Sequence, residues 1–155
     1  MPAGDLITGN WQVEIRGTLT GDGTIFTLDE PGISGLGAPP PKTHTDTPLD
    51  HADGTYQGRH FSASRLLTVP YVISVDEGTD EENAEAAGAA FVSLSALWVA
   101  SETAVEMHFQ LPGFGHRFVV GRPLGLADDL SLLRVCVARG LATFDCGDPT
   151  LTVVS

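Results

Sequence analysis

Apolar and polar side chains alternate over residues 65–75, and this alternation predicts one long β-strand. The side chains that fall on one face at a period of two are Leu67, Val69, Tyr71, Ile73 and Val75. Because successive side chains of a strand point to opposite faces, this face should pack on a core, with Thr68, Pro70 and Ser74 on the other. Pro70 has no N–H to donate to a neighbouring strand, so we expect it at an edge or an irregularity of the sheet.

Two further regions have the pattern of paired strands. Residues 11–16 and 24–28 flank Thr20-Gly21-Asp22-Gly23, and because Asp-Gly is a strong signal for a tight turn, they predict a two-stranded hairpin closed there. Residues 105–111 also alternate between apolar and polar side chains. A Pro-Gly-Phe-Gly turn at 112–115 leads from them into a strand over 116–123, which predicts a second hairpin.

Residues 79–100 predict one helix. Thr79 and Glu82 have the spacing of a capping box, and acidic side chains occupy the first turn, where the helix dipole favours them. Apolar residues spaced at three and four form a stripe made of Ala84, Ala87, Phe91, Leu94 and Trp98. This stripe should pack on a sheet. The predicted core residues are Phe91, Leu94, Trp98 and Phe109.

The last third of the chain predicts short strands separated by turns. The residues expected on one face of the first strand are Leu133, Val135 and Val137. A turn at Gly140, a strand over 141–146 and a Gly-Asp-Pro corner follow, and Asp148 should cap its own backbone in that corner. Many short strands with one helix predict a mainly-β fold, a β-sandwich with one packed α-helix, a β-hairpin and a long arm.

Residues 29–58 contain few side chains that a core could hold. They include several glycines, the run of prolines 39–41, and alternating Thr, His and Asp. This Pro/Gly-rich composition predicts no regular structure of its own, so the segment is either a disordered surface loop or an arm that a neighbouring subunit orders. Deleting residues 35–47 should then spare the fold. The candidate interface residues are Pro39, Pro40, Pro41, Tyr56 and Pro70.

Charge and composition narrow the class of protein. The chain of 155 residues has 20 acidic and 8 basic side chains, a net charge of -12, which is the wrong sign for tight binding of nucleic acid. No stretch reaches the roughly 20 apolar residues of a membrane span, so we expect no membrane insertion. The N-terminus lacks the basic and apolar regions of a signal peptide, so we expect a soluble protein that is not exported by that route. Cys136 and Cys146 should be free, buried thiols.

The sequence contains few residues that could form a metal site or a catalytic site. His44 with His51, and His108 with His116, are the pairs to consider for a metal, but neither has the spacing of a zinc site. His108 is therefore expected as a solvated or hydrogen-bonded histidine. No serine has the Gly-x-Ser-x-Gly surroundings of a hydrolase nucleophile, and the acidic residues near the helix start resemble a solvated cap. We expect no catalytic residues, no metal and no cofactor.

The order of several features resembles a known family. The features are Asp53-Gly54, Tyr56-x-Gly58, the segment 65–73, the helix that closes at Trp98, Leu111-Pro-Gly113, Arg117 before Gly121-Arg122-Pro123, and Phe144 with Asp148-Pro149. Together they resemble the distal tail proteins of long-tailed bacteriophages, in particular the minor tail proteins of phages of actinobacteria. The resemblance spans nearly the whole chain.

The resemblance implies a structural virion protein and not an enzyme. It implies that residues 1–155 form a single ring-forming domain, six copies of which join the tail tube protein to the tail hub or baseplate at the tail tip, after synthesis in the host cytoplasm. Phage DNA would pass through the ring without tight binding. Larger members carry a C-terminal carbohydrate-binding-like domain, which we expect to be absent here. The candidates for acids that line the channel are Asp76, Glu77, Asp128 and Asp129.

Two other classes stay open from the sequence. A carbohydrate-binding or adhesin-like β-sandwich would need an exposed aromatic platform, for which Trp11 and Tyr56 are the candidates. A small hydrolase would need a paired nucleophile and base, and the sequence offers none. The oligomeric state separates the classes, because a ring of about six copies favours a scaffold.

Overall fold

The structure is a computed structural model that describes residues 2–21, 26–29, 32–36, 42–44, 47–48, 55–56, 60–62, 64–100, 102–148 and 150–154. Its elements are β1 Gln12–Ile15, β2 Thr18–Gly21, β3 Phe26–Leu28, β4 Lys42–His44, β5 Thr47–Pro48, β6 Thr55–Tyr56, β7 His60–Ser62, β8 Arg65–Ser74, α1 Asp80–Leu97, β9 Val105–Leu111, β10 Gly115–Asp129, the 3-10 helix η1 Leu133–Val135, β11 Val137–Cys146 and β12 Thr152–Val153.

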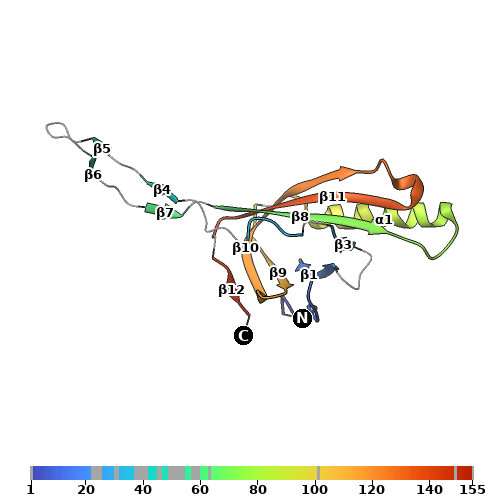
Figure 1. Ribbon diagram of the computed structural model, residues 1–155, viewed down its shortest axis with the longest axis horizontal. Helices are drawn as coiled ribbons and strands as arrows, with labels where there is room; N and C mark the ends of the chain where they lie inside the picture. Colours follow the sequence, from blue (N-terminus) through green and yellow to red (C-terminus); the bar gives the residue numbers. More distant parts are fainter. Residues whose placement is uncertain are drawn as a thin grey trace.

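Most strands belong to one curled antiparallel sheet of eight strands. Its order is β2-β1-β9-β10-β11-β8-β3, and β12 also pairs with β10. The long strand β10 joins two halves, because residues 115–121 pair with β9 whereas residues 122–129 pair with β11. In Figure 1, β8 and β11 run along the long axis, and the start of β10 turns away from that axis together with β9. The mainly-β prediction with one packed helix is confirmed, and the two layers of the predicted sandwich are halves of a single sheet.

The core lies between the two halves of the sheet and α1. The alternation predicted for residues 65–75 is confirmed, since Leu67, Val69, Tyr71 and Ile73 are buried. From the helix, Phe91, Leu94 and Trp98 are buried, and Phe109 of β9 is buried as well. The Trp98 ring lies 6.0 Å from the ring of Tyr71 and 6.2 Å from the ring of Phe144. One indole therefore joins α1 to both central strands, β8 and β11.

Pro70 lies at a break in the pairing of β8, as predicted. Strand β3 pairs with residues 71–73 of β8, and the next contact on that side is the bridge between Ser34 and Thr68. The carbonyl of Pro70 accepts from the backbone N–H of Asp29 at 2.9 Å. Its missing N–H therefore falls on the side of β8 where the ladder is interrupted, and the other side pairs with β11 along its whole length.

Helix α1 begins where the capping box predicts. The N-cap residue is Thr79, whose hydroxyl accepts from the backbone N–H of Glu82 at 3.3 Å, and the Glu82 carboxylate accepts from the backbone N–H of Thr79 at 3.0 Å. The hydrogen bonds that the Glu82 carboxylate accepts from the backbone N–H and the hydroxyl of Thr79 hold the pKa of Glu82 below its usual value. The sequence reasoning missed Asn83, which is buried and accepts from the backbone of Glu77 and Gly78. Asn83 therefore fixes the loop that enters the helix.

The first predicted hairpin is closed at a different turn. The residues that connect β1 to β2 are Arg16 and Gly17, with φ of 50° and 73°. Two consecutive positive φ angles are those of a type I′ turn, whose twist matches paired strands. The predicted hairpin closed at Thr20–Gly23 is wrong, because β1 pairs with β2 and β3 crosses to the opposite edge of the sheet beside β8, and residues 22–25 lie outside the described part of the chain.

The strand predicted through Leu133, Val135 and Val137 is also wrong. Leu133–Val135 is the short helix η1, and Cys136 has a left-handed backbone with φ of 63°, so β11 begins only at Val137. The predicted turn at Gly140 is absent, since β11 runs through that residue and pairs there with Tyr71. Position 140 has little room for a side chain, because Leu126 and the ring of Phe91 lie directly over Gly140. Apolar periodicity alone could not separate a helical turn from a strand here.

The Pro/Gly-rich segment contains regular structure in its described residues. Strands β4 and β7 form one antiparallel ladder, and β5 and β6 form another. The expectation of no regular structure is therefore wrong for these strands. In Figure 1 the two ladders extend beyond the start of β8, away from the sheet and the helix. We refer to residues 42–62 as the arm. Upstream of it, Leu36 is buried in the core.

Candidate assembly surface

The sheet half made of β8, β11 and residues 122–129 of β10 has one face that is uncovered in the described part of the chain. The residues of this outer face are Leu66, Thr68, Pro70 and Val72 of β8, Arg139, Leu141 and Thr143 of β11, and Ala127 and Asp129 of β10. Those of β8 and β11 alternate with core residues and therefore point away from α1, and the two residues of β10 pair with Leu141 and Arg139. Pro70, Leu141 and Ala127 form one row across the three strands. Leu141 is 43% exposed and Leu66 is 53% exposed.

The outer face is apolar at its centre and charged at one end. Pro70 and Leu141 line a shallow hollow of about 260 Å³, which also includes Asp29, Asp129 and Arg139. The guanidinium of Arg139 lies 3.7 Å from the carboxylate of Asp29. Asp129 accepts from the backbone N–H of Ser131 at 3.0 Å, and hydrogen bonding to Ser131 lowers its pKa. An apolar patch with a charged border is typical of a surface that binds another protein.

The four candidate channel acids gather at one end of the molecule. Asp76 and Glu77 lie in the loop between β8 and α1, and Asp128 and Asp129 end β10. All four are exposed. In Figure 1 the loop after β8 and the turn between β10 and β11 lie at the same end of the long axis, opposite the arm. The structure brings these acids to one end, where Arg139 pairs in register with Asp129 and Arg134 lines the same pocket as Asp76.

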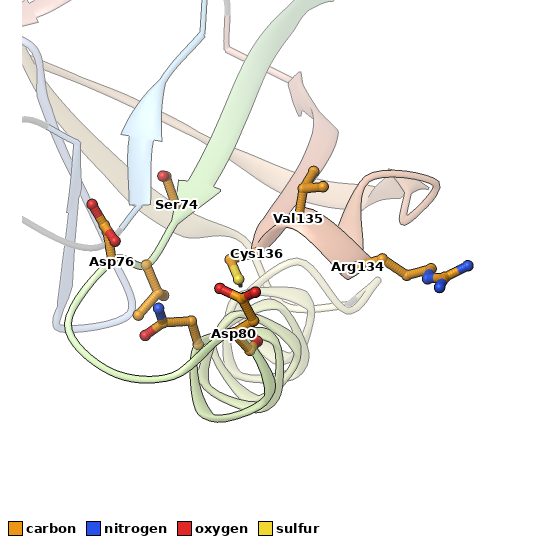
Figure 2. A pocket seen from close by; sticks show the side chains of 8 residues that line it. Ser74, Asp76, Asp80, Arg134, Val135 and Cys136 are labelled. Carbon is orange, nitrogen blue, oxygen red and sulfur yellow. Dashed lines mark hydrogen bonds between the residues drawn. The ribbon is translucent and has the colours of Figure 1, made fainter.

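A pocket of about 330 Å³ opens beside Asp76, between the end of β8, the start of α1 and η1. Figure 2 shows Asp76 and Asp80 at its wall and the side chain of Arg134 directed away from it. The thiol of Cys136 donates to the backbone carbonyl of Asp80 at 3.4 Å. The described residues that line the pocket include no histidine and no lysine.

The structure brings His108 and His116 together, although their spacing does not suggest a metal site. Nδ1 of His108 lies 3.3 Å from Nε2 of His116, and Nε2 of His108 lies 2.9 Å from the carboxylate of Glu106. Of the two expected states, solvated or hydrogen-bonded, His108 has the second, and it is buried. Among the described residues no group of three side chains could hold a metal ion. His51 lies outside the described residues, and His44 is on β4.

The other candidate interface and binding residues are scattered. Pro39, Pro40 and Pro41 lie outside the described residues, Tyr56 is on β6 in the arm, and Pro70 is on the outer face. Trp11, offered as part of a sugar platform, is 46% exposed.

Both cysteines are free and buried, as predicted. Burial raises the pKa of the Cys146 thiol to about 12, so it stays protonated at neutral pH and is a poor nucleophile. Asp148 accepts from the backbone N–H of Thr150 at 2.9 Å, as predicted for a turn residue.

Sequence comparison assigns no family, because no family model and no curated protein matches the chain. The fold is similar to a solved structure, that of the Dit protein (gp 19.1) of phage SPP1, described as a paradigm of the hub adsorption apparatus in phages that infect Gram-positive bacteria. The TM-score is 0.61 at 15% identity, over 90% of this chain and 51% of that protein. The chain thus spans about half the length of that relative. In the described residues, no helix is long and apolar enough to cross a membrane.

Proposed function

We propose that this chain is a structural protein of a phage tail tip, one of about six copies in a ring that joins the tail tube protein to the hub or baseplate. The observation that carries this proposal is the fold, which matches that of a phage hub protein over 90% of the chain. The resemblance of the sequence to distal tail proteins points to the same class of protein. We propose that the chain is synthesised in the cytoplasm of the host and is then incorporated into the tail tip of the assembling virion.

The geometry of the subunit supports a ring. The outer face presents one surface, and the arm extends beyond the start of β8, away from the sheet. Two different surfaces on one subunit suit a heterologous interface, in which each copy contacts the next and the rotation closes a ring. In this proposal the outer face and the arm, with Tyr56, provide the contacts between neighbouring copies.

The charge of the chain fits a channel through which DNA passes. Six copies at -12 each sum to 6 × -12 = -72, and a wall of one sign repels phosphate instead of binding it. Asp76, Glu77, Asp128 and Asp129 are the proposed channel acids because they gather at one end of the subunit. Neither catalysis nor a cofactor is part of this function.

The first test is the mass of the purified protein by light scattering, with a change at the centre of the outer face. We expect wild-type protein at about six times 16.3 kDa and Leu141→Glu at a lower mass, since a carboxylate buried in an apolar interface is strongly unfavourable. Leu132→Glu is the matched control, because Leu132 is exposed to 42% against 43% for Leu141 and lies off the outer face. A monomeric wild-type protein would contradict the ring and favour a carbohydrate-binding module.

A second test removes the arm. The deletion of residues 35–47 expected from the sequence to spare the fold is unsuitable, because it removes Leu36, which is buried and whose carbonyl accepts from Arg65 at 2.9 Å. Lys42 and Ser62 are paired across the β4–β7 ladder, so residues 42–62 can be replaced by a short Gly-Ser linker. We expect an unchanged melting temperature and a smaller assembly. Intact rings from this variant would exclude the arm as a ring contact.

A further inference from the structure

A segment at the N-terminus covers a buried polar cluster on the sheet half made of β1, β9 and residues 115–121 of β10. We refer to residues 2–9 as the strap. The backbone N–H groups of Gly4 and Leu6 donate to the two carboxylate oxygens of Glu14 at 2.9 and 3.0 Å. Those of Thr8 and Gly9 donate to Oε1 of Gln12 at 2.8 and 3.0 Å. Two buried side chains of β1 therefore hold the strap by its backbone.

The strap lies directly on the histidine pair. Gly4 is buried with φ of 92°, and a Cβ at this position would lie 2.5 Å from Nδ1 of His108 and 3.1 Å from Cε1 of His116. On the other side, the ring of His108 is stacked on Phe118 with centroids 5.0 Å apart. The ring of His108 is thus enclosed between the strap and the sheet, and the partly buried ring of His116 lies against the same glycine of the strap.

The hydrogen bonds of the pair define its protonation. A carboxylate can only accept, so His108 donates its Nε2–H to Glu106 and its Nδ1 is left as an acceptor. Nε2–H of His116 then donates to Nδ1 of His108. A proton added to His116 places a positive charge at the end of this chain of hydrogen bonds, 3.3 Å from His108 and beside Gly4 of the strap.

The charged groups around the pair include two carboxylates and one guanidinium. Strand β1 contributes Glu14 and β9 contributes Glu106, and Arg16, which follows β1, lines one hollow with both of them and with Ala3 of the strap. Burial, then the charge of His108, lowers the pKa of His116, and Glu14 only partly opposes this. A depressed histidine pKa means that the closed state binds protons less readily than the open state. The closed state is therefore favoured above about pH 6.5, the ordinary histidine value, and loses stability as the pH falls below it.

We propose that the strap is an acid-released cover, in which protonation of His116 detaches residues 2–9 and exposes the outer surface of β1, β9 and the start of β10. Release requires no unfolding of the core, because α1 and β8 lie in the other part of the molecule. The proposal is independent of the ring, since it concerns contacts within one chain.

Hydrogen exchange measured by mass spectrometry, corrected for the intrinsic effect of pH on exchange, tests the proposal. From pH 7.5 to pH 5.5 we expect strap peptides of the wild-type protein to lose about tenfold in protection, as one linked proton gives about tenfold per pH unit. Peptides of β8 and α1 should keep their protection. His116→Gln retains a side-chain N–H donor but cannot titrate, so its strap should stay protected at pH 5.5. Gly4→Ala, whose Cβ meets His108, should show an open strap already at pH 7.5.

Three results would overturn the proposal. One is equal strap protection at both pH values in the wild-type protein, and another is the same acid loss in His116→Gln. The third is a strap that becomes insensitive to pH in Glu14→Gln, which would place the titration on that carboxylate. If His116→Gln does not fold, the NMR titration of the imidazoles in the wild-type protein replaces it. The pH midpoint of strap exchange must then coincide with the titration midpoint of the His116 imidazole. A difference of more than about one pH unit would exclude His116 as the group that releases the strap.

Discussion

Replacing Trp98 with alanine should lower the free energy of unfolding by about 3 to 5 kcal/mol, the usual cost of removing a large buried aromatic side chain. Trp98 is 1% exposed, and its ring contacts Tyr71 and Phe144 from β8 and β11. The cavity would open where the C-terminal end of α1 joins the sheet, and the surrounding rings cannot collapse into it without moving both strands. Thermal and denaturant unfolding followed by circular dichroism measure the change.

Two variants make this result specific. Val92→Ala removes an apolar side chain from the exposed side of the same helix, where Val92 is 67% exposed, and should change stability by no more than about 0.5 kcal/mol. Trp98→Phe should cost less than Trp98→Ala, because a phenyl ring leaves a smaller cavity than a methyl group. Both variants remove Nε1, which has no hydrogen-bond partner in the described part of the chain. A melting temperature for Trp98→Ala equal to that of the wild-type protein would show that α1 does not pack on the sheet.

Gly121→Ala should destabilise the protein by about 1 to 3 kcal/mol or more, the range for overpacking in a rigid site. Gly121 is the last residue of β10 that pairs with β9, directly before the strand begins to pair with β11. A Cβ there would meet the carbonyl oxygen of Asp145 and the Cα of Cys146. These are backbone atoms of β11, so the clash can be relieved only by a shift of a whole strand.

Gly147→Ala is the matched control for Gly121→Ala. Gly147 lies just after β11, its φ is not in the left-handed region, and an added Cβ would have no heavy atom within 4 Å. Its replacement should therefore be neutral or slightly stabilising, because alanine restricts the unfolded chain. Equal unfolding midpoints for the two variants would show that the crossing of β10 and β11 has room that the structure does not indicate.

The elements predicted correctly are those whose signals are local. The alternation in β8, the capping box at Thr79 and the apolar stripe of α1 each involve residues within a few positions of one another. The hairpin of β9 and β10 is also local, because a tight turn at residues 112–114 joins the two strands. In such segments the period of the apolar side chains depends on the secondary structure, so the sequence by itself determined the strand, the helix and the face that each buries.

The remaining features depended on contacts between distant residues. Strand β3 pairs with β8 and not with β2, a choice made by the edge that the curled sheet offers and not by the turn residues between them. Glu14 and His108 have the sequence pattern of solvent-facing positions, yet both are buried, because the strap folds over them. Local periodicity reports which side chains share a face. What covers that face is decided by the tertiary structure, since burial depends on elements far apart in the chain.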